Sequence, residues 1–263
     1  MNERHVPWID DEARRLLGAE RDRVPVTSLT ERRGELALKD AYLIQAAAIS
    51  RRIAAGARVV GHKAGVTSKA MQEQMGVGEP DSGVLLDDMV LHGGSPLERS
   101  ELLQPRVEAE IAFRLGRDLA GPEPGLAAVR YAVAEVFLAL EVIDTRYTGW
   151  RITVADSIAD NASCARVVTG PPLPFNGELD LAAEPLVVSV DGMTVARGEG
   201  RAVLGHPFHA LAWLANRLAR FGAGLKAGDL VLAGAVHASL ALEAGSTVRA
   251  HAPHLPPVEL HVT

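Results

Sequence analysis

Residues 105–115, PRVEAEIAFRL, alternate apolar side chains with charged or small ones, a pattern typical of a β-strand. In an extended chain every second side chain shares a face. The apolar residues of 107–113 would therefore lie on one face, and Glu108, Glu110 and Ala112 on the other. Residues 136–143, VFLALEVI, form an apolar run that only Glu141 interrupts, as expected for a strand buried on both faces. These two segments predict a core built around a β-sheet.

The chain before these strands is predicted to be helical. Residues 36–55 place apolar side chains at three- and four-residue steps, and residues 10–20 show a weaker helical spacing. Later helices are predicted over 68–75, 126–134 and 209–221, and a short strand over 58–61. The sequence thus predicts an α+β protein with a helical N-terminal segment, residues 1–57, packed against a mixed, strand-rich core, residues 58–263.

Turn signals mark the strands of the C-terminal half. Asp191-Gly192 lies between two apolar runs and predicts a β-hairpin over 186–195. The phrases KAGDLVLAG (226–234) and EAGSTVRAH (243–251) each place Ala-Gly and a polar residue before a strand. Because the phrase occurs only twice, it predicts consecutive strands of one sheet rather than a solenoid.

The composition of the 263 residues is that of a globular protein, with 48% hydrophobic and 23% charged side chains. The 33 acidic and 27 basic residues give a net charge of −6, which argues against binding to nucleic acid or to an anionic membrane. The single cysteine, Cys164, excludes an intramolecular disulfide. The charged N-terminus does not resemble a secretory signal, and the longest apolar run is too short to span a membrane. We therefore expect a cytoplasmic protein without membrane or nucleic-acid partners.

The paired acids Glu108 and Glu110 have two interpretations. They could form the solvated face of a half-exposed strand, or they could share a cation that relieves their repulsion. Glu141 favours the second interpretation, because an unpaired carboxylate inside an apolar strand would cost several kcal/mol, so that it requires a cationic partner. Three carboxylates together would make an all-oxygen site suited to Mg²⁺ or Mn²⁺.

Lys63 and Asp81 are further candidates for chemistry. Only four of the 27 basic residues are lysines, and lysine, unlike arginine, can release its proton when it is desolvated. Lys63 lies between glycines at the predicted end of a strand, where a ligand could approach; an ordinary surface lysine is the alternative. Asp81, in the turn-prone segment GEPDSG (78–83), could equally serve as a turn cap.

Other kinds of site find little support. The nine histidines show no metal-ligand spacing, and His206, which precedes Pro207, is expected to cap or pack against the start of a helix. The segment GHKAGVTS (61–68) matches no nucleotide-binding loop. Ser163-Cys164 lacks the nucleophile-elbow pattern of a hydrolase.

Six segments in this order resemble one family. They are VGHKAGVTSKAMQEQMGV (60–77), GEPDSGVLLDDMV (78–90), LQPRVEAEIAFRLGRDLAGP (103–122), ALEVIDTRYTGW (139–150), DSIADNASCARVVTG (156–170) and LGHPFHALAWLANRLARFG (204–222). They are similar to the 2-hydroxypenta-2,4-dienoate (2-keto-4-pentenoate) hydratases and to the related 4-oxalocrotonate decarboxylases, both of the fumarylacetoacetate hydrolase superfamily. The resemblance extends from about residue 35 to residue 235.

The resemblance implies a fold and a metal. The fold would be a mixed, strongly bent β-roll with a helical N-terminal part, and the chain would form a homo-oligomer that could associate with a sibling hydratase or decarboxylase. Glu108 and Glu110 in PRVEAEIA and Glu141 in ALEVID match the metal-binding carboxylates, with Mg²⁺ or Mn²⁺ as the cofactor. The substrate would be a small 2-oxo or 2-hydroxydienoic acid.

The resemblance also assigns three residues to the reaction. Lys63 in GHKAG matches the active-site lysine, Asp81 in EPDSG its acidic partner, and Ser163 in ADNAS a residue that lines the substrate site. Beside a metal ion and partly desolvated, Lys63 is expected to have a lowered proton affinity, which suits proton transfer.

Several activities remain open at this stage. LQPR (103–106) and the Trp of DTRYTGW (144–150) favour a hydratase, which adds water to a 2-hydroxy-2,4-dienoate, whereas Tyr147 and Arg166 resemble the decarboxylases. His62 departs from the Trp common in hydratases, and Ala233 from the usual Ser or Thr. Hydrolysis of a C–C bond is a third alternative, and a non-catalytic relative a fourth. Hydration is our first prediction, and decarboxylation of 4-oxalocrotonate or an analogue our second.

Overall fold

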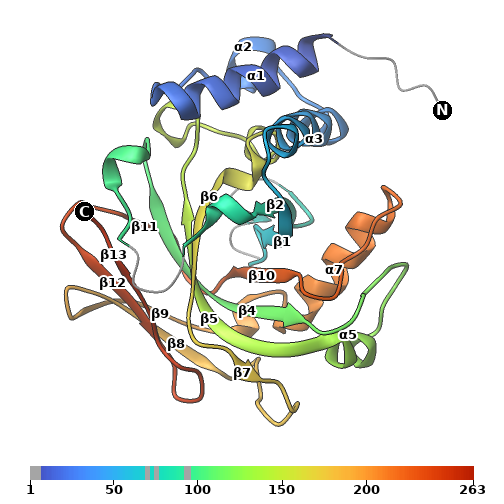
Figure 1. The fold of residues 1–263 in the computed structure, drawn as a ribbon, viewed down its shortest axis with the longest axis vertical. Helices are drawn as coiled ribbons and strands as arrows, with labels where there is room; N and C mark the ends of the chain where they lie inside the picture. Colours follow the sequence, from blue (N-terminus) through green and yellow to red (C-terminus); the bar gives the residue numbers. More distant parts are fainter. Residues whose placement is uncertain (1–6, 69–71, 74–76, 92–95) are drawn as a thin grey trace.

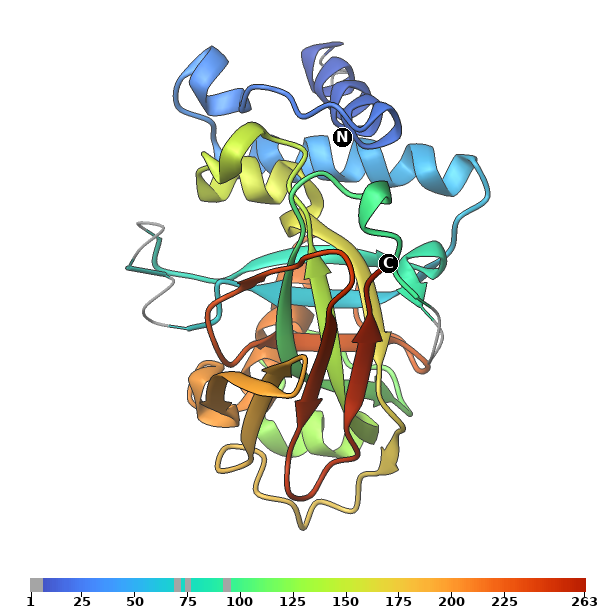
Figure 2. The same cartoon turned by 90° about the vertical axis from the view of Figure 1, so that its left-hand side faces the viewer.

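The structure, a computed structural model, describes residues 7–68, 72–73, 77–91 and 96–263. The N-terminal helices lie together at one end of the molecule, and the strands form a strongly curled sheet with a smaller sheet beside it (Figure 1; Figure 2). This arrangement confirms the predicted α+β class with a bent, mixed β-core. The short helix predicted over 68–75 lies mostly outside the described residues.

Four helices form the layer at that end. They are α1 (Pro7–Asp22), α2 (Leu29–Arg33), α3 (Leu38–Ala54) and α6 (Val154–Ala159). Their apolar faces share one buried cluster that includes Ala13, Ile44 and Ile158. The helices predicted over 10–20 and 36–55 are confirmed, whereas α2 was missed because five residues carry too little periodicity. The predicted division at residues 57 and 58 falls between α3 and the first strand. Because α6 packs on the N-terminal helices, a division into two domains stays a prediction.

The larger sheet has nine strands in the described part of the chain, ordered β2-β1-β10-β4-β5-β6-β3, with β7 beside β5 and β11 beside β4. They are β1 (Val59–Gly65), β2 (Asp81–Leu86), β3 (Val90–Leu91), β4 (Arg106–Leu115), β5 (Val133–Ile143), β6 (Cys164–Thr169), β7 (Leu173–Pro174), β10 (Leu230–Ala235) and β11 (Leu240–Ala241). The sheet is mixed, because β1–β10 and β3–β6 are parallel and the other pairs antiparallel. The strand predicted over 58–61 continues to Gly65, so Lys63 lies inside β1 rather than at its end.

Strands β4 and β5 each have one face on the outside of the curled sheet and one face on its inside. On the outer face, Ile111 and Leu138 belong to the main apolar core. On the inner face, Ala112 and Phe137 belong to a second apolar cluster. The alternation predicted for 107–115 is therefore confirmed, but nearly all of β4 is buried on both faces rather than half-exposed.

A second sheet, in the order β13-β12-β8-β9, packs against the outer face of β5. Its strands are β8 (Pro185–Val190), β9 (Met193–Glu199), β12 (Thr247–His251) and β13 (Val258–His261). The hairpin predicted over Asp191-Gly192 joins β8 to β9. The prediction that the two Ala-Gly phrases precede strands of one sheet is wrong, because β10 lies in the larger sheet and β12 in the smaller one. The repeated phrase specifies a turn before a strand and carries no information about the strand's partner.

Two helices, α5 (Leu126–Ala132) and α7 (Pro207–Ala219), contact each other and the larger sheet (Figure 1), and Arg217 of α7 also lies over the ring of Tyr42 on α3. The helix predicted over 126–134 ends earlier because Val133 pairs with Leu115 in the sheet. His206 caps α7, since its Nδ1 accepts a hydrogen bond from the Phe208 N–H at 3.0 Å, as predicted. No helix among the described residues is both long and apolar enough to cross a membrane.

Candidate metal centre

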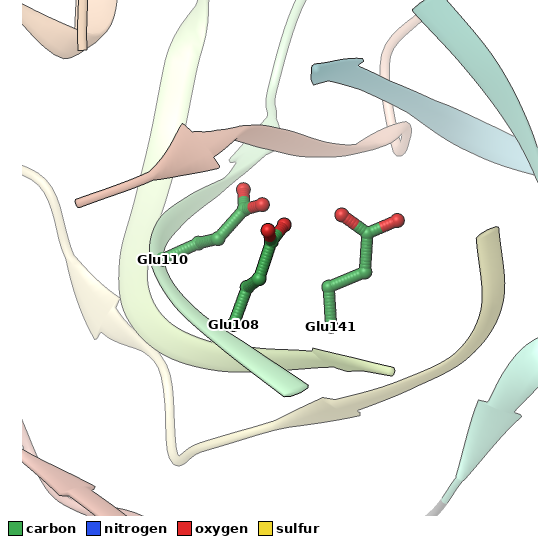
Figure 3. Close-up of side chains that lie close together, drawn as sticks. All are labelled: Glu108, Glu110 and Glu141. Atoms are coloured by element: carbon green, nitrogen blue, oxygen red, sulfur yellow. The ribbon is translucent and has the colours of Figure 1, made fainter. Parts of the chain in front are cut away.

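Three glutamates converge on the inner face of the curled sheet. Glu108 on β4 and Glu141 on β5 are direct cross-strand partners, and Glu110 follows Glu108 on the same face. Each offers a carboxylate oxygen, and these oxygens all lie within 4.8 Å of one another. Figure 3 shows the three carboxylates on the same side of the two strands, pointing into the curl. The structure therefore brings together the three acids that the sequence singled out.

This cluster is buried, and its charges are not balanced by hydrogen bonds. Glu141 is 0% exposed and Glu110 1%, while Glu108 is half-buried. Both Glu141 oxygens and Oε1 of Glu110 accept no hydrogen bond from the described residues. Burial, followed by repulsion from Glu141, raises the pKa of Glu108 to about 7 and raises the pKa of Glu110 well above its ordinary value. Such a cluster is unfavourable unless a cation joins it.

Lys63 approaches the cluster from a distant strand. Strands β10 and β4 lie between β1 and β5, so a flat sheet would separate Lys63 from Glu141 by about 14 Å at the usual strand spacing. The curl of the sheet instead brings Lys63 Nζ to 3.2 Å from Glu141 Oε1, with both side chains buried. The sheet's curvature thus creates this ion pair, which no spacing in the sequence specifies.

The protein's own charges hold the proton on Lys63. Burial alone would lower the pKa of the ammonium, but the carboxylates of Glu141 and Asp81 outweigh it, so that the pKa is raised above its ordinary value. The lowering of its proton affinity was predicted for a lysine beside a bound metal ion, and it stays a prediction. A cation bound to the carboxylates would add to the effect of burial and oppose their influence on the pKa of Lys63.

Asp81 lies beside Lys63, on the first residue of β2. It pairs with Gly65 of β1, and a Cβ atom on Gly65 would lie 2.2 Å from Asp81 Oδ1 and 3.3 Å from Lys63 Nζ. Ser157 Oγ donates a hydrogen bond of 3.0 Å to Asp81 Oδ2, and burial raises the pKa of the carboxyl. The prediction that Asp81 lies in a loop is wrong, because pairing with β1 overrides the turn-like composition of GEPDSG.

Ser163 ends an unusual turn at the start of β6. Asn161, Ala162 and Ser163 all have positive φ, between 50° and 57°, a conformation that costs non-glycine residues roughly 1–2 kcal/mol each. The Asn161 side chain ties this turn to β2 through both backbone groups of Val84, at 2.8 and 2.9 Å. Ser163 Oγ is buried and has no hydrogen-bond partner among the described residues. Strain of this kind is typical of functional sites.

Sequence reasoning missed two contributors to this site. Ser157 on α6, which bonds Asp81, carries no recognisable pattern. Gly234 donates its backbone N–H to Glu110 Oε2 at 2.7 Å and has a φ of 114°. A Cβ atom there would lie 2.1 Å from Thr67 Oγ1, so only glycine fits. A glycine that closes an apolar strand was the available signal.

The donors fit a hard divalent cation. All candidate ligands are carboxylate oxygens, which Mg²⁺ and Mn²⁺ prefer. The four acids Glu108, Glu110, Glu141 and Asp81 outnumber the cations Lys63 and Arg106 that act on them, and three of the acidic oxygens in the glutamate cluster accept no hydrogen bond from the described residues. A divalent ion would supply the missing charge and partners at once.

Comparison with known proteins points to one family. The model of the fumarylacetoacetate (FAA) hydrolase C-terminal family matches residues 53–263. A 2-keto-4-pentenoate hydratase of Paraburkholderia phymatum is 41% identical over 92% of this chain and 93% of its own. A 2-hydroxyhexa-2,4-dienoate hydratase of Comamonas testosteroni is 40% identical over 87% and 88%.

A solved structure matches nearly the whole fold. The 4-oxalocrotonate decarboxylase from Pseudomonas putida G7, complexed with magnesium and adipate, superposes with a TM-score of 0.94 at 33% identity, covering 98% of each chain. The helical N-terminal layer and the curled sheet are therefore shared with that enzyme as one arrangement.

Proposed function

Because the chain belongs to the fumarylacetoacetate hydrolase family, we propose that it is a divalent-metal-dependent lyase that hydrates a 2-hydroxy-2,4-dienoate. The product would be a 4-hydroxy-2-oxo acid. The observation that carries the proposal is the buried cluster of Glu108, Glu110 and Glu141 beside Lys63. Relatives that are 40% identical or more over most of the chain are named hydratases of such dienoates, which supports the substrate class.

In this proposal the three glutamates hold Mg²⁺ or Mn²⁺. Such an ion acts as a Lewis acid on the 2-oxygen and the carboxylate of a 2-oxo acid. Glu141 is the ligand that Lys63 contacts, and Glu110 is oriented by the Gly234 N–H. The magnesium in the similar decarboxylase and the manganese in a fumarylpyruvate hydrolase of the same fold are consistent with either ion.

Lys63, Asp81 and Ser163 are proposed to have three different roles toward the substrate: proton transfer, orientation of Lys63, and binding. Lys63 Nζ would carry a proton between the 2-hydroxyl group and the carbon chain when the dienol becomes an unsaturated ketone, before water adds at C4. Asp81, buried and held by Ser157, would keep Lys63 oriented and charged between transfers. Ser163 Oγ, which lacks a hydrogen-bond partner in the described residues, would bind a polar group of the substrate.

Decarboxylation of 4-oxalocrotonate or a similar 2-oxo diacid is the second candidate. The structural match to the 4-oxalocrotonate decarboxylase favours it, because that match spans both chains almost entirely. When a distal carboxylate departs as CO₂, the substrate's conjugated 2-oxo group would take up the electron pair as an enolate, to which Lys63 Nζ would donate a proton; a metal held by the glutamates would supply Lewis-acid stabilisation. Higher identity to the hydratases, 41% against 33%, places hydration first.

One experiment separates the two activities. Purified protein with Mg²⁺ is offered 2-hydroxypenta-2,4-dienoate, 2-hydroxyhexa-2,4-dienoate and 4-oxalocrotonate, and dienol absorbance and CO₂ are followed together. Loss of dienol absorbance without CO₂ supports the hydratase, and CO₂ release supports the decarboxylase. Turnover that persists after exhaustive chelation would contradict the metal-dependent proposal in both forms.

We also propose that the protein is cytoplasmic, as its composition predicts, and that it forms a homo-oligomer, as its resemblance to the family implies. Size-exclusion chromatography with light scattering measures the number of copies, and a mass equal to 27.9 kDa would contradict the proposed homo-oligomer.

A further inference from the structure

The edge of β4 that faces β10 is irregular at the candidate ligands. Strand β10 pairs with β4 from Leu230 to Leu232, and the register then shifts before Ala235 meets Glu110. Pairing resumes only where Leu240 of β11 meets Val107. Between these points, Ala109 faces the segment that links the two strands rather than a regular strand.

His237, in this linking segment, supplies the hydrogen-bond acceptor that Ala109 lacks on this edge of β4. Its Nε2 accepts a hydrogen bond from the Ala109 N–H at 3.0 Å, while the neighbouring Val236 N–H bonds the Ala109 carbonyl at 3.3 Å. The imidazole thus takes the place of the strand carbonyl that would accept this N–H in a regular ladder. Ala109 is the residue between Glu108 and Glu110, and it is fully buried.

The second ring nitrogen, Nδ1, determines which tautomer of His237 accepts the hydrogen bond from Ala109. Nδ1 lies 2.7 Å from the Ala238 carbonyl oxygen, which can only accept, so Nδ1 carries the proton and Nε2 a free lone pair. Burial lowers the pKa of the ring, in agreement with a neutral imidazole. With both nitrogens engaged by backbone groups, His237 is not itself a metal ligand.

We propose that His237 is a positioning residue of the metal centre, which holds the β4 backbone between Glu108 and Glu110 in place on the edge that no regular strand covers. The inference rests on the proposed metal site. Glu108 and Glu110 face Glu141 through the regular β4–β5 ladder, and His237 supports the opposite edge of β4 at the residue between the two ligands. Without an acceptor, the buried Ala109 N–H would favour a local shift of the backbone that carries both carboxylates.

The test compares metal binding in two variants that differ by one methylene group. In His237→Gln the side-chain amide reaches the position of Nε2 and can accept from Ala109, whereas in His237→Asn it reaches only that of Nδ1. Manganese affinity is measured by calorimetry and by electron paramagnetic resonance on metal-depleted protein. We expect the Asn variant to bind Mn²⁺ about ten- to hundredfold more weakly, and the Gln variant to bind close to wild type.

His206→Ala is the matched control. It also removes a ring nitrogen that accepts a backbone N–H at 3.0 Å, but at the start of α7. We expect it to lower the thermal midpoint and leave Mn²⁺ affinity unchanged, which separates a general loss of stability from a loss of positioning. Equal Mn²⁺ affinity in the Gln and Asn variants would overturn the role of His237. A wild-type protein that binds no Mn²⁺ would overturn the metal centre itself.

Discussion

Two clusters of buried charge lie close together in the sequence of this protein and differ in how they are satisfied. Arg146 and Asp160 are 5% and 2% exposed. Arg146 Nε and backbone N–H both donate to the Asp160 carboxylate, at 2.5 and 2.9 Å, and Thr145 Oγ1 adds a third hydrogen bond at 3.1 Å. The remaining guanidinium nitrogens bond the carbonyls of Asp160 and Cys164. This pair is neutral, and its polar groups are partnered within the protein.

The glutamate cluster has the opposite character. Lys63 is paired with Glu141, and Arg106 acts only on Glu108, so the three glutamates keep an excess of negative charge; the buried Glu141 carboxylate accepts no hydrogen bond from the described residues. Arg146 and Asp160, whose charges and polar groups are partnered within the protein, stabilise local structure; we call this pair the closed cluster. Glu108, Glu110 and Glu141, which keep an excess of negative charge, can bind a cation; we call them the open cluster. The contrast shows that buried charge alone does not indicate a functional site. Buried carboxylate oxygens without a hydrogen-bond partner do indicate one.

The largest expected effect comes from removing one charge of the open cluster. Glu141→Gln should reduce turnover on the order of a thousandfold, because a lost ligand removes several kcal/mol of Lewis-acid stabilisation. The metal-free variant should remain folded, since the change relieves repulsion among the glutamates. Glu135→Gln, also on β5 but half-exposed and paired with Arg114, is the control and should leave turnover unchanged. Steady-state rates, Mg²⁺ calorimetry and thermal scans of both variants decide the matter. Undiminished Mg²⁺ binding in Glu141→Gln would contradict its role as a ligand.

In the closed cluster the same kind of change should act on stability. Arg146→Met leaves Asp160 buried without its cation and should lower the free energy of unfolding by about 3–5 kcal/mol. Arg249→Met removes an exposed arginine 3.8 Å from Glu259 and should cost no more than about 1 kcal/mol. Denaturant titration measures both. If Arg146→Met were as stable as Arg249→Met, the Arg146–Asp160 pair would not stabilise the fold, and the contrast between the two clusters would be wrong.

Much of the open cluster could be predicted from the sequence, because it depends on local alternation. The period of two in residues 107–115 sets Glu108 and Glu110 on one face, and Glu141 stands out as the only charge in the apolar run 136–143. These rules hold for any pleated strand, so the orientation of the three side chains follows from the residues. That they face each other depends further on the register between β4 and β5, which the sequence did not specify.

The parts that could not be predicted depend on long-range geometry. Lys63 reaches Glu141 only because the sheet curls, and Asp81 joins β2 only because β1 lies beside it. Both residues were assigned through resemblance to a family, not through any spacing. The role of His237 was missed for a similar reason, since the gap between β10 and β11 that it fills exists only in three dimensions.

A smaller effect should separate charge from proton transfer at Lys63. Lys63→Arg keeps a cation near Glu141 but removes a group that can release a proton, so turnover should fall by about 10²–10⁴. Mn²⁺ affinity should change far less than turnover, because the charge of the cluster is preserved. Lys226→Arg, at an exposed lysine 2.9 Å from Asp118, is the control. Wild-type turnover in Lys63→Arg would limit Lys63 to an electrostatic role.

The smallest effect is a pH dependence that should distinguish the open cluster from the closed one. The pKa of Glu108 is raised from 4.5 to about 7, so the metal-free fold binds this proton more tightly than the unfolded chain does. Its contribution to stability is therefore present at low pH and is lost as pH rises from 4.5 through 7. Mg²⁺ must displace the same proton, so its dissociation constant should fall about tenfold for each pH unit gained below pH 7.

Calorimetry at pH 6 and pH 8, in buffers with different ionisation enthalpies, measures both the affinity and the protons released. Added Mg²⁺ should accordingly raise the thermal midpoint more at pH 8 than at pH 6. In Glu108→Gln, proton release on binding should decrease but not vanish, because this titrating group is gone while Glu110 retains a raised pKa. The Arg146–Asp160 pair should not respond to Mg²⁺ at either pH, because its groups are already partnered within the protein. A Mg²⁺ affinity equal at pH 6 and pH 8 would mean that the carboxylates are ionised before the metal arrives, and that the excess charge of the open cluster is relieved in some other way.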